Sequence, residues 1–153
     1  MIHFQSIEKK KRYPYFDLLL IGDEGVTEVE KYLDKGELLL VLMDQFAIGV
    51  MLFIPVDQTT IELKNFGLLP EWQRKGFGGQ ALMLAIAYYR ERYQKMEVGT
   101  GNSSLDNLAF YQKCGFRMVA IKSNFFSNYA EPIYENGIRC LDLVVLEKTI
   151  ENN

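Results

Sequence analysis

Three runs with strand character follow one another between residues 37 and 69, and the gaps between them are too short for a helix. The first two, ELLLVLMD and FAIGVMLFIP, flank a tight turn at Asp44-Gln45, and TTIELKNFGLL comes next. Apolar runs of this length bounded by turn residues are typical of strands, and a tight turn pairs two of them as a hairpin. The runs therefore predict an antiparallel meander, which argues against a doubly wound parallel sheet.

Helical and strand patterns alternate on both sides of this meander. IHFQSI alternates as a first strand, and residues 13–37 indicate two short helices or one broken helix, with Gly22 and Gly25 at the break and Gly36 at the end. After the meander we expect a helix at 76–94, the strand KMEVGT, a helix in SSLDNLAFYQKCGF, and two final strands, FRMVAIKSNF and IRCLDLVVLEK, joined by the loop FSNYAEPIYENG. This order predicts a mixed α+β fold, and the 153 residues, 1–153, suit one domain with one core.

Composition excludes several classes of protein. A net charge of −3 gives no support to a nucleic-acid surface, and the apolar runs are too short to span a membrane. No apolar segment of signal-peptide length follows the first charges, so we expect a cytoplasmic protein. His3 is the sole histidine, which argues against a histidine-based nucleophilic site and against a metal site. Cys114 and Cys140 fit free thiols in a reducing compartment.

The stretch PEWQRKGFGGQAL, residues 70–82, places two basic residues and three glycines where an apolar helical pattern begins. Glycine costs conformational entropy at such a position, but it lets a ligand come close to the backbone. The first turn of a helix has free N–H groups and the positive end of the helix dipole, and together these bind anions. We therefore expect a phosphate-binding loop here.

Three kinds of phosphate loop compete for this stretch. The nucleoside-triphosphate loop needs G-x-x-x-x-G-K-[ST], which is absent. The dinucleotide fingerprint G-x-G-x-x-G/A matches residues 76–81, with Glu97 about 20 residues on, but it should follow its strand directly. The third is Q/R-x-x-G-x-G/A, which Gln73-Arg74-Lys75-Gly76-Phe77-Gly78 fits at each required place.

This third loop is that of the GNAT N-acetyltransferases, and the resemblance extends beyond it. IELKNFGLLPEW looks like the family's fourth strand, and NLAFYQKCGF looks like its A-I-x-L/F-Y-x-K-x-G-F helix end. The resemblance implies a central, mostly antiparallel twisted sheet of about seven strands flanked by about four helices.

It further implies that acetyl-CoA is the acetyl donor and that no metal takes part. The pyrophosphate would sit on the backbone amides from Arg74 to Gly79, and the pantetheine arm would pair with Phe66 and Leu68. The Leu68 N–H would be the oxyanion donor. The residues implied in cofactor binding are Phe66, Leu68, Gln73, Arg74, Lys75, Gly76, Phe77, Gly78, Gly79, Asn102, Ser104 and Asn107.

Three of these assignments concern a departure from the family pattern. Many relatives carry asparagine seven residues before the family's tyrosine, and Ser104 stands there in this chain, with Asn102 and Asn107 nearby as substitutes. The tyrosine itself is Tyr111, which we expect to protonate the departing thiolate. Glu62, on the fourth strand, is the expected base, acting through water.

The implied reaction is transfer of an acetyl group to a primary amine of a small molecule or peptide; the alternative is a non-catalytic acyl-CoA-binding or sensor module on the same fold. The loop between the last two strands holds aromatic and acidic residues that would suit a cationic amine. The same loop also fits an ordinary lid or a homodimer contact. Its aromatic and acidic residues are Phe125, Phe126, Tyr129, Glu131, Tyr134 and Glu135.

Overall fold

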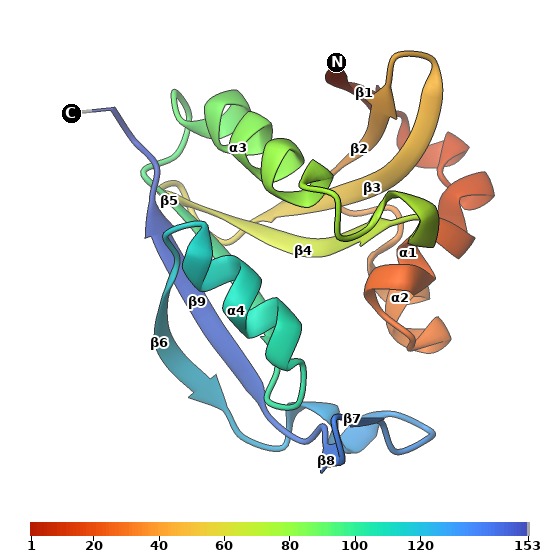
Figure 1. Ribbon diagram of the computed structural model, residues 1–153, viewed down its shortest axis with the longest axis vertical. Coiled ribbons are helices and arrows are strands. Elements are labelled where there is room, and N and C mark those ends of the chain that lie inside the picture. The colour runs from red at the N-terminus through yellow and green to blue at the C-terminus, as the bar shows by residue number, and fades with distance from the viewer. Residues whose placement is uncertain (153) are drawn as a thin grey trace.

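The computed structural model describes residues 1–152 as a seven-stranded sheet with helices on both faces (Figure 1). The strand order is β1-β2-β3-β4-β5-β9-β6. All neighbours are antiparallel except β4 and β5, so the predicted sheet is confirmed. Its strands are β1 (Ile2–Ile7), β2 (Glu37–Met43), β3 (Phe46–Pro55), β4 (Thr60–Leu68), β5 (Lys95–Gly101), β6 (Arg117–Lys122) and β9 (Leu143–Thr149).

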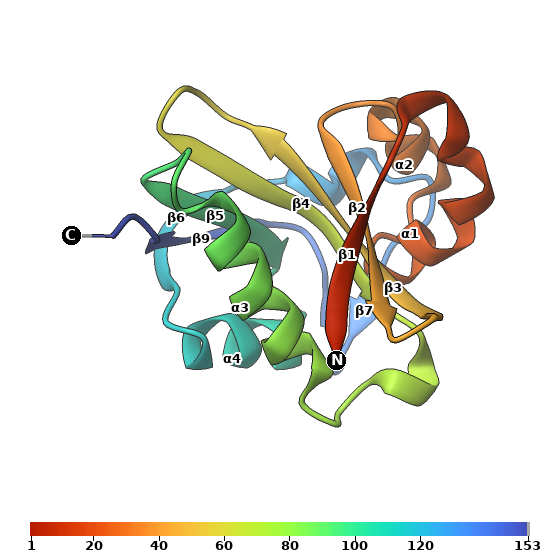
Figure 2. The same cartoon turned by 90° about the horizontal axis from the view of Figure 1, so that it is seen from above.

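Two helices cover each face of this sheet. The α-helices of residues 1–152 are α1 (Phe16–Gly22), α2 (Val26–Tyr32), α3 (Phe77–Tyr89) and α4 (Leu105–Lys113). Short 3₁₀ turns are η1 (Lys9–Lys11), η2 (Tyr13–Tyr15), η3 (Pro70–Trp72) and η4 (Phe125–Asn128). Figures 1 and 2 show α1 and α2 on one side of the sheet and α3 and α4 on the other. None of these helices is long and apolar enough to cross a membrane.

Each pair of helices closes its own apolar core, because the alternating strands send side chains to both faces. The core beneath α3 and α4 includes Phe53, Leu82 and Phe116. The core beneath α1 and α2 is smaller and includes Leu19 and Val29. The sheet is thus covered on both faces, and most residues of β2 and β3 are buried.

The sheet divides where β4 leaves β5. Only residues Thr60–Leu63 of β4 pair with Lys95–Val98 of β5, in parallel, and the two strands then diverge. Figure 1 shows the result as a V, with β4 in one arm and β9 and β6 in the other. In the register of β3 against β4, Leu52 faces Asn65 and Phe53 faces Leu63. Lys64 is therefore the extra residue of a β-bulge, which bends the strand at the point of divergence.

Two predicted boundaries were wrong, each because other contacts took the backbone groups. Helix α3 ends at Tyr89 and not at Gln94, whose N–H donates to Thr59 O in the β3–β4 turn at 2.8 Å. The last strand begins at Leu143 and not at Ile138. Part of the predicted loop is a small hairpin, in which β7 (Tyr134–Glu135) pairs with β8 (Ile138–Arg139).

Candidate active site

Two clefts enter the divided sheet from opposite sides. The glycine-loop cleft, of about 740 Å³, lies between β4, the loop 73–79 and α4. The aromatic cleft, of about 690 Å³, lies between α1, α2, β4 and the segment 124–135. The two clefts share six lining residues around the point of divergence, so they meet there. The shared residues are Ile21, Gly22, Lys64, Gly99, Thr100 and Asn107.

The glycine loop turns sharply before α3 begins. Arg74 and Gly76 have φ angles of 59° and 87°, and Gly76 is the N-cap residue in a left-handed conformation. Glycine adopts this conformation without strain, which explains its place at this position. Gln73 Nε2 donates to Leu68 O at 2.8 Å and so ties the loop to the end of β4.

The N-terminus of α3 is open toward the glycine-loop cleft. No side chain caps this 13-residue helix, and a Cβ built at Gly76 or Gly79 would meet no atom within 4 Å. A Cβ at Gly78 would lie 3.5 Å from the ring of Phe110, an ordinary contact. The first N–H groups of α3 are therefore accessible to a ligand, and the helix dipole favours an anionic one.

Of the basic and aromatic side chains in this loop, only that of Arg74 lines the glycine-loop cleft. Arg74 lines the cleft and lies 3.8 Å from the Asp106 carboxylate, but both side chains are largely exposed and the pair is weak. Lys75 is exposed and does not line either cleft. Phe77 packs against Trp72, with 5.3 Å between ring centroids, and joins the core beneath α3. Lys75 and Phe77 can therefore offer a ligand their backbone N–H groups rather than their side chains.

Tyr111 lies in the wall of the glycine-loop cleft and is 7% exposed. Its ring packs edge-on against Phe110 and Phe116. Within residues 1–152 its hydroxyl forms no hydrogen bond, so the phenol proton is free for a ligand. Burial raises the pKa of Tyr111 above its ordinary value of 10.0, which keeps the phenol protonated at neutral pH.

Strand β4 presents the remaining expected residues of this cleft. Phe66 and Leu68 both line it, and Phe66 lies 6.4 Å from the Phe110 ring. Beyond Leu63 the edge of β4 toward β5 has no strand partner. An extended, amide-rich ligand can add to such an edge in the way that a strand does.

Glu62 on β4 lines the aromatic cleft and not the glycine-loop cleft. It stands in register with Glu97 on β5. Burial raises the pKa of Glu97, and the charge of Glu62 raises it further. The Glu97 carboxyl therefore binds its proton more readily than an isolated one. Glu97 is a residue that the sequence analysis missed as a neighbour of Glu62, because 35 residues separate them.

The three polar residues expected near α4 are dispersed. Asn107 lines both clefts, and Ser104 lines the aromatic cleft. Asn102 lines neither, because its Oδ1 accepts from the N–H groups of Leu141 and Asp142, at 2.9 and 3.0 Å. The same two bonds remove residues 141 and 142 from the ladder and explain why β9 starts late.

The two serines at the start of α4 bind a distant residue and do not cap the helix. The N-cap residue is Ser104, and its side chain does not cap the helix. Instead the hydroxyls of Ser103 and Ser104 donate to Glu135 Oε1, at 3.2 and 2.8 Å. Glu135 thereby fastens the β7–β8 hairpin to the N-terminal end of α4.

A hydrogen-bonded chain that the sequence did not reveal joins the walls of the aromatic cleft. The hydroxyls of Tyr32 and Tyr129 each donate to the Asp23 carboxylate at 2.9 Å. The buried Asn65 donates to Tyr32 Oη at 2.9 Å and to Leu19 O at 2.8 Å. Asp23 and Tyr129 are 106 residues apart. No spacing pattern could have related them.

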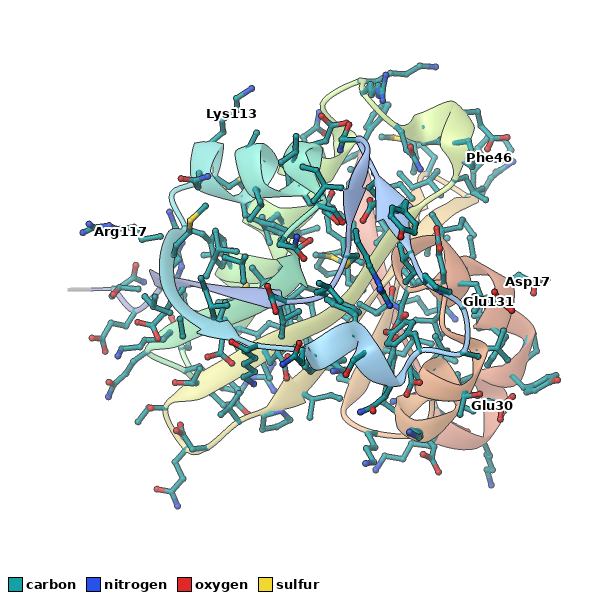
Figure 3. The ribbon with its side chains drawn as sticks, turned by 90° about the horizontal axis from the view of Figure 1, so that it is seen from below. Asp17, Glu30, Phe46, Lys113, Arg117 and Glu131 are labelled. Carbon is teal, nitrogen blue, oxygen red and sulfur yellow. The ribbon has the colours of Figure 1, made fainter. Side chains whose placement is uncertain are left out.

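The segment expected to hold the acceptor is divided in the structure. Phe125, Phe126 and Tyr129 line the aromatic cleft. Tyr134 and Glu131 are exposed, and neither lines the aromatic cleft. In Figure 3, Glu131 lies on the same side of the view as Asp17 and Glu30, while Lys113 and Arg117 lie on the opposite side. Within residues 1–152 no three potential metal ligands lie together.

Comparison with known proteins adds to this geometry. A sequence model described as the acetyltransferase (GNAT) family matches residues 7–116. An uncharacterized N-acetyltransferase of Bacillus subtilis, YvbK, is 40% identical over 137 residues, and the match covers 86% of each chain.

Two crystal structures resemble the chain over nearly its whole length. The first is a GNAT family acetyltransferase from Elizabethkingia anophelis with acetyl-CoA bound, which is 40% identical with a TM-score of 0.89, over 97% of each chain. The second is a Bacillus subtilis acetyltransferase in complex with CoA, which is 37% identical with a TM-score of 0.83, again over 97% of each chain.

Proposed function

Because the chain belongs to the acetyltransferase (GNAT) family, we propose that it moves the acetyl group of acetyl-CoA to a primary amine of a small molecule or peptide. The observation that carries the proposal is the meeting of two clefts at the divergence of β4 and β5. A donor in one cleft and an acceptor in the other would face each other there, which is what direct transfer between two bound molecules requires.

The glycine-loop cleft fits acetyl-CoA. The open N-terminus of α3 suits the pyrophosphate, with N–H groups from Arg74 to Gly79 as donors. The free edge of β4 at Phe66 and Leu68 suits the pantetheine amides, with the Leu68 N–H as the donor to the acetyl oxygen. Bound there, acetyl-CoA supplies a thioester acetyl group and a thiol leaving group.

Tyr111 acts on the leaving sulfur in this proposal. A phenol whose pKa is raised is neutral throughout the physiological range and can donate a hydrogen bond to a developing thiolate. A thiol has an ordinary pKa of about 8.5, so the Tyr111 phenol stabilises the thiolate without having to give up its proton completely. The sulfur finally takes the proton that the amine loses, and the reaction is balanced.

Glu62 acts on the acceptor. The amine attacks only when neutral, and a carboxylate in the aromatic cleft can accept its proton directly or through water. The register partner of Glu62 on β5 is Glu97, whose pKa is raised by burial and by the charge of Glu62.

The experiment incubates the protein with acetyl-CoA and a panel of amino acids, polyamines, aminoglycosides and short peptides, and measures thiol release. Release with at least one amine supports the proposal. Stabilisation by acetyl-CoA without release from any amine would favour the alternative, a binding or sensor module. NAD and ATP serve as ligand controls in the melting measurements, since stabilisation by either would contradict the assignment of the glycine loop.

A matched pair of variants tests the donor site itself. Gly78→Asp brings a negative charge to the cleft, and Gly78→Asn brings a neutral side chain of the same shape. Both should fold, because a Cβ at Gly78 makes only ordinary contacts. We expect Gly78→Asp to abolish acetyl-CoA binding, and Gly78→Asn to weaken it much less.

A further inference from the structure

Lys64 occupies the place where both clefts meet. It is the extra residue of the bulge in β4, and it follows directly after the last residue that pairs with β5. A bulge redirects a side chain out of the ordinary alternation of a strand. Lys64 is accordingly one of the residues that line both the glycine-loop cleft and the aromatic cleft.

The Lys64 ammonium has its hydrogen-bonding capacity unused. Its Nζ lies 5.4 Å from the centre of the Tyr32 ring and 5.8 Å from that of Phe125. The side chain is half-buried, and within residues 1–152 it forms neither an ion pair nor a hydrogen bond. Two ring faces hold the cation in place but accept none of its three N–H donors. A cation held this way in a cleft is suited to an anionic group of a ligand.

A carboxylate of the protein lines the same cleft as this cation. Glu62 precedes Lys64 by two residues on β4, and both side chains line the aromatic cleft. At roughly 3.3 Å of rise per strand residue, their α-carbons are about 7 Å apart. A negative and a positive group at this spacing complement a small molecule that carries both charges, with its amine toward Glu62 and its anion toward Lys64.

Four more carboxylates line the aromatic cleft, those of Asp23, Glu24, Glu28 and Glu135. Three of them are already engaged within the protein, Asp23 by two tyrosine hydroxyls, Glu28 by Lys31 and Glu135 by two serine hydroxyls. The apolar part of the lining is suited to an apolar body. The volume of the cleft, about 690 Å³, lies in the usual range for small-molecule sites. The apolar and aromatic residues that line it beyond Lys64 include Ile21, Phe125, Phe126, Tyr129, Ile133 and Leu143.

We propose that the acceptor is a small amine that also carries a carboxylate and an apolar group, such as an α-amino acid with a large apolar or aromatic side chain, and that Lys64 binds its carboxylate. This inference rests on the proposed acetyl transfer and names the acceptor class of that site. Lys64 is then a specificity residue, because it binds a part of the acceptor that does not react.

The experiment compares phenylalanine, phenylalanine amide and phenethylamine as acceptors by thiol release. The three amines differ in basicity, so the diagnostic quantity is the ratio of kcat/KM for phenylalanine to that for its amide, compared between wild type and variants. We expect the wild type to favour phenylalanine by about tenfold or more, the size of one charge-assisted hydrogen bond. Lys64→Met should bring the ratio down by about the same factor, and Lys64→Arg should retain most of it.

Lys113→Met is the matched control. Lys113 is exposed and lines neither cleft, so its loss should leave the ratio unchanged. Melting temperature and acetyl-CoA binding of Lys64→Met show whether that variant is folded. The comparison of the three amines on the wild type needs no variant.

The possible outcomes separate this inference from the proposed function. Acetylation of amines with the same ratio in the wild type and Lys64→Met would overturn the role of Lys64 and leave acetyl transfer intact. A wild type that favours the two amines without a carboxylate would overturn it as well. Failure to acetylate any amine of the broad panel, although acetyl-CoA binds, would overturn both.

Discussion

At the scale of single residues, the protonation state of Tyr111 is determined by its burial. The ring packs against Phe110 and Phe116, and the residue lines the glycine-loop cleft. Removal of the hydroxyl leaves this packing unchanged. The residue therefore offers a clean separation of binding from chemistry.

We predict that Tyr111→Phe lowers kcat by about 10²-fold or more while the Kd for acetyl-CoA stays within about twofold, because the loss of one positioned donor to a developing anion costs about 10²–10³-fold in kcat. Steady-state thiol release and calorimetric titration give the two quantities. Tyr93→Phe is the control, since Tyr93 packs against Tyr89 and lines neither cleft. An unchanged kcat in Tyr111→Phe would remove Tyr111 from the mechanism.

The Glu62–Glu97 pair gives a second prediction, on stability. The pKa of Glu97 is raised in the folded protein, so the native state binds its proton more tightly than the unfolded chain does. The stability that this tighter proton binding adds to the folded state is fully present below the ordinary pKa of 4.5, and it is lost as the pH rises through the raised value. Glu97→Gln should therefore raise the melting temperature by a few degrees at pH 7, and the gain should disappear near pH 4.

Asp57 is the control of opposite sign. Hydrogen bonds from Thr59 and Thr60 lower the pKa of its carboxyl, so its contribution is present above the ordinary pKa of 3.8 and is lost as the pH falls through the lowered value. Asp57→Asn should lower the melting temperature at pH 7, with the difference shrinking in acid. Equal pH dependence in both variants would contradict the assigned pKa directions.

At the scale of elements, the last turn of α1 packs directly onto the bulged part of β4. A Cβ at Gly22 would collide with Asn65 Oδ1 and lie 2.7 Å from Phe66 O. Strand β4 cannot move away from α1, because its residues on both sides of Lys64 are paired with β3. Glycine is thus required here for a close approach of two backbones.

We predict that Gly22→Ala destabilises the protein by about 1–3 kcal/mol, the usual cost of overpacking, and lowers the melting temperature by several degrees. Thermal unfolding without ligand measures this. Gly79→Ala is the control, because a Cβ there meets no atom within 4 Å and alanine favours a helix. Its melting temperature should equal or exceed that of the wild type. A stable Gly22→Ala would mean that α1 can move away from β4.

The elements that the sequence predicted well are those with local signals. The meander, the glycine loop and α4 each follow from a short pattern, and the family resemblance then supplied Tyr111 and Glu62. Contacts over long separations were not predictable. Asn102 binds residues 141 and 142, and Glu135 binds Ser103 and Ser104, so neither the late start of β9 nor the uncapped α4 has a local signature.

At the scale of the whole molecule, the sheet is divided into two arms, and a ligand in the glycine-loop cleft contacts both of them. The first arm holds β1 to β4, and the second holds β5, β9 and β6. Only the short pairing of Thr60–Leu63 with Lys95–Val98 joins them along the sheet. The glycine-loop cleft is lined from both arms, by β4 and by β5 with α4. A ligand in this cleft therefore adds contacts between the two arms.

We predict that acetyl-CoA slows amide hydrogen exchange in both arms, at 64–68 on β4 and at 98–111 across β5 and α4, and not only in the glycine loop 73–79. At about 100 times its Kd a ligand adds about 2.7 kcal/mol to the free energy of unfolding, so global opening should slow as well. The localised effect is measured by exchange at short times, when only local opening contributes.

Gly78→Asp, which should not bind, provides the baseline for this measurement, and free CoA shows how much of the protection depends on the acetyl group. If protection were confined to 73–79, the ligand would contact the loop alone, and β4 and β5 would have no part in holding it. Protection of both arms in the wild type, absent from Gly78→Asp, would mean that the divided sheet closes on its donor. In that case the aromatic cleft, which shares Lys64, Gly99 and Asn107 with the glycine-loop cleft, would be completed only when acetyl-CoA is bound. Acceptor affinity should then be higher in the presence of CoA than in its absence.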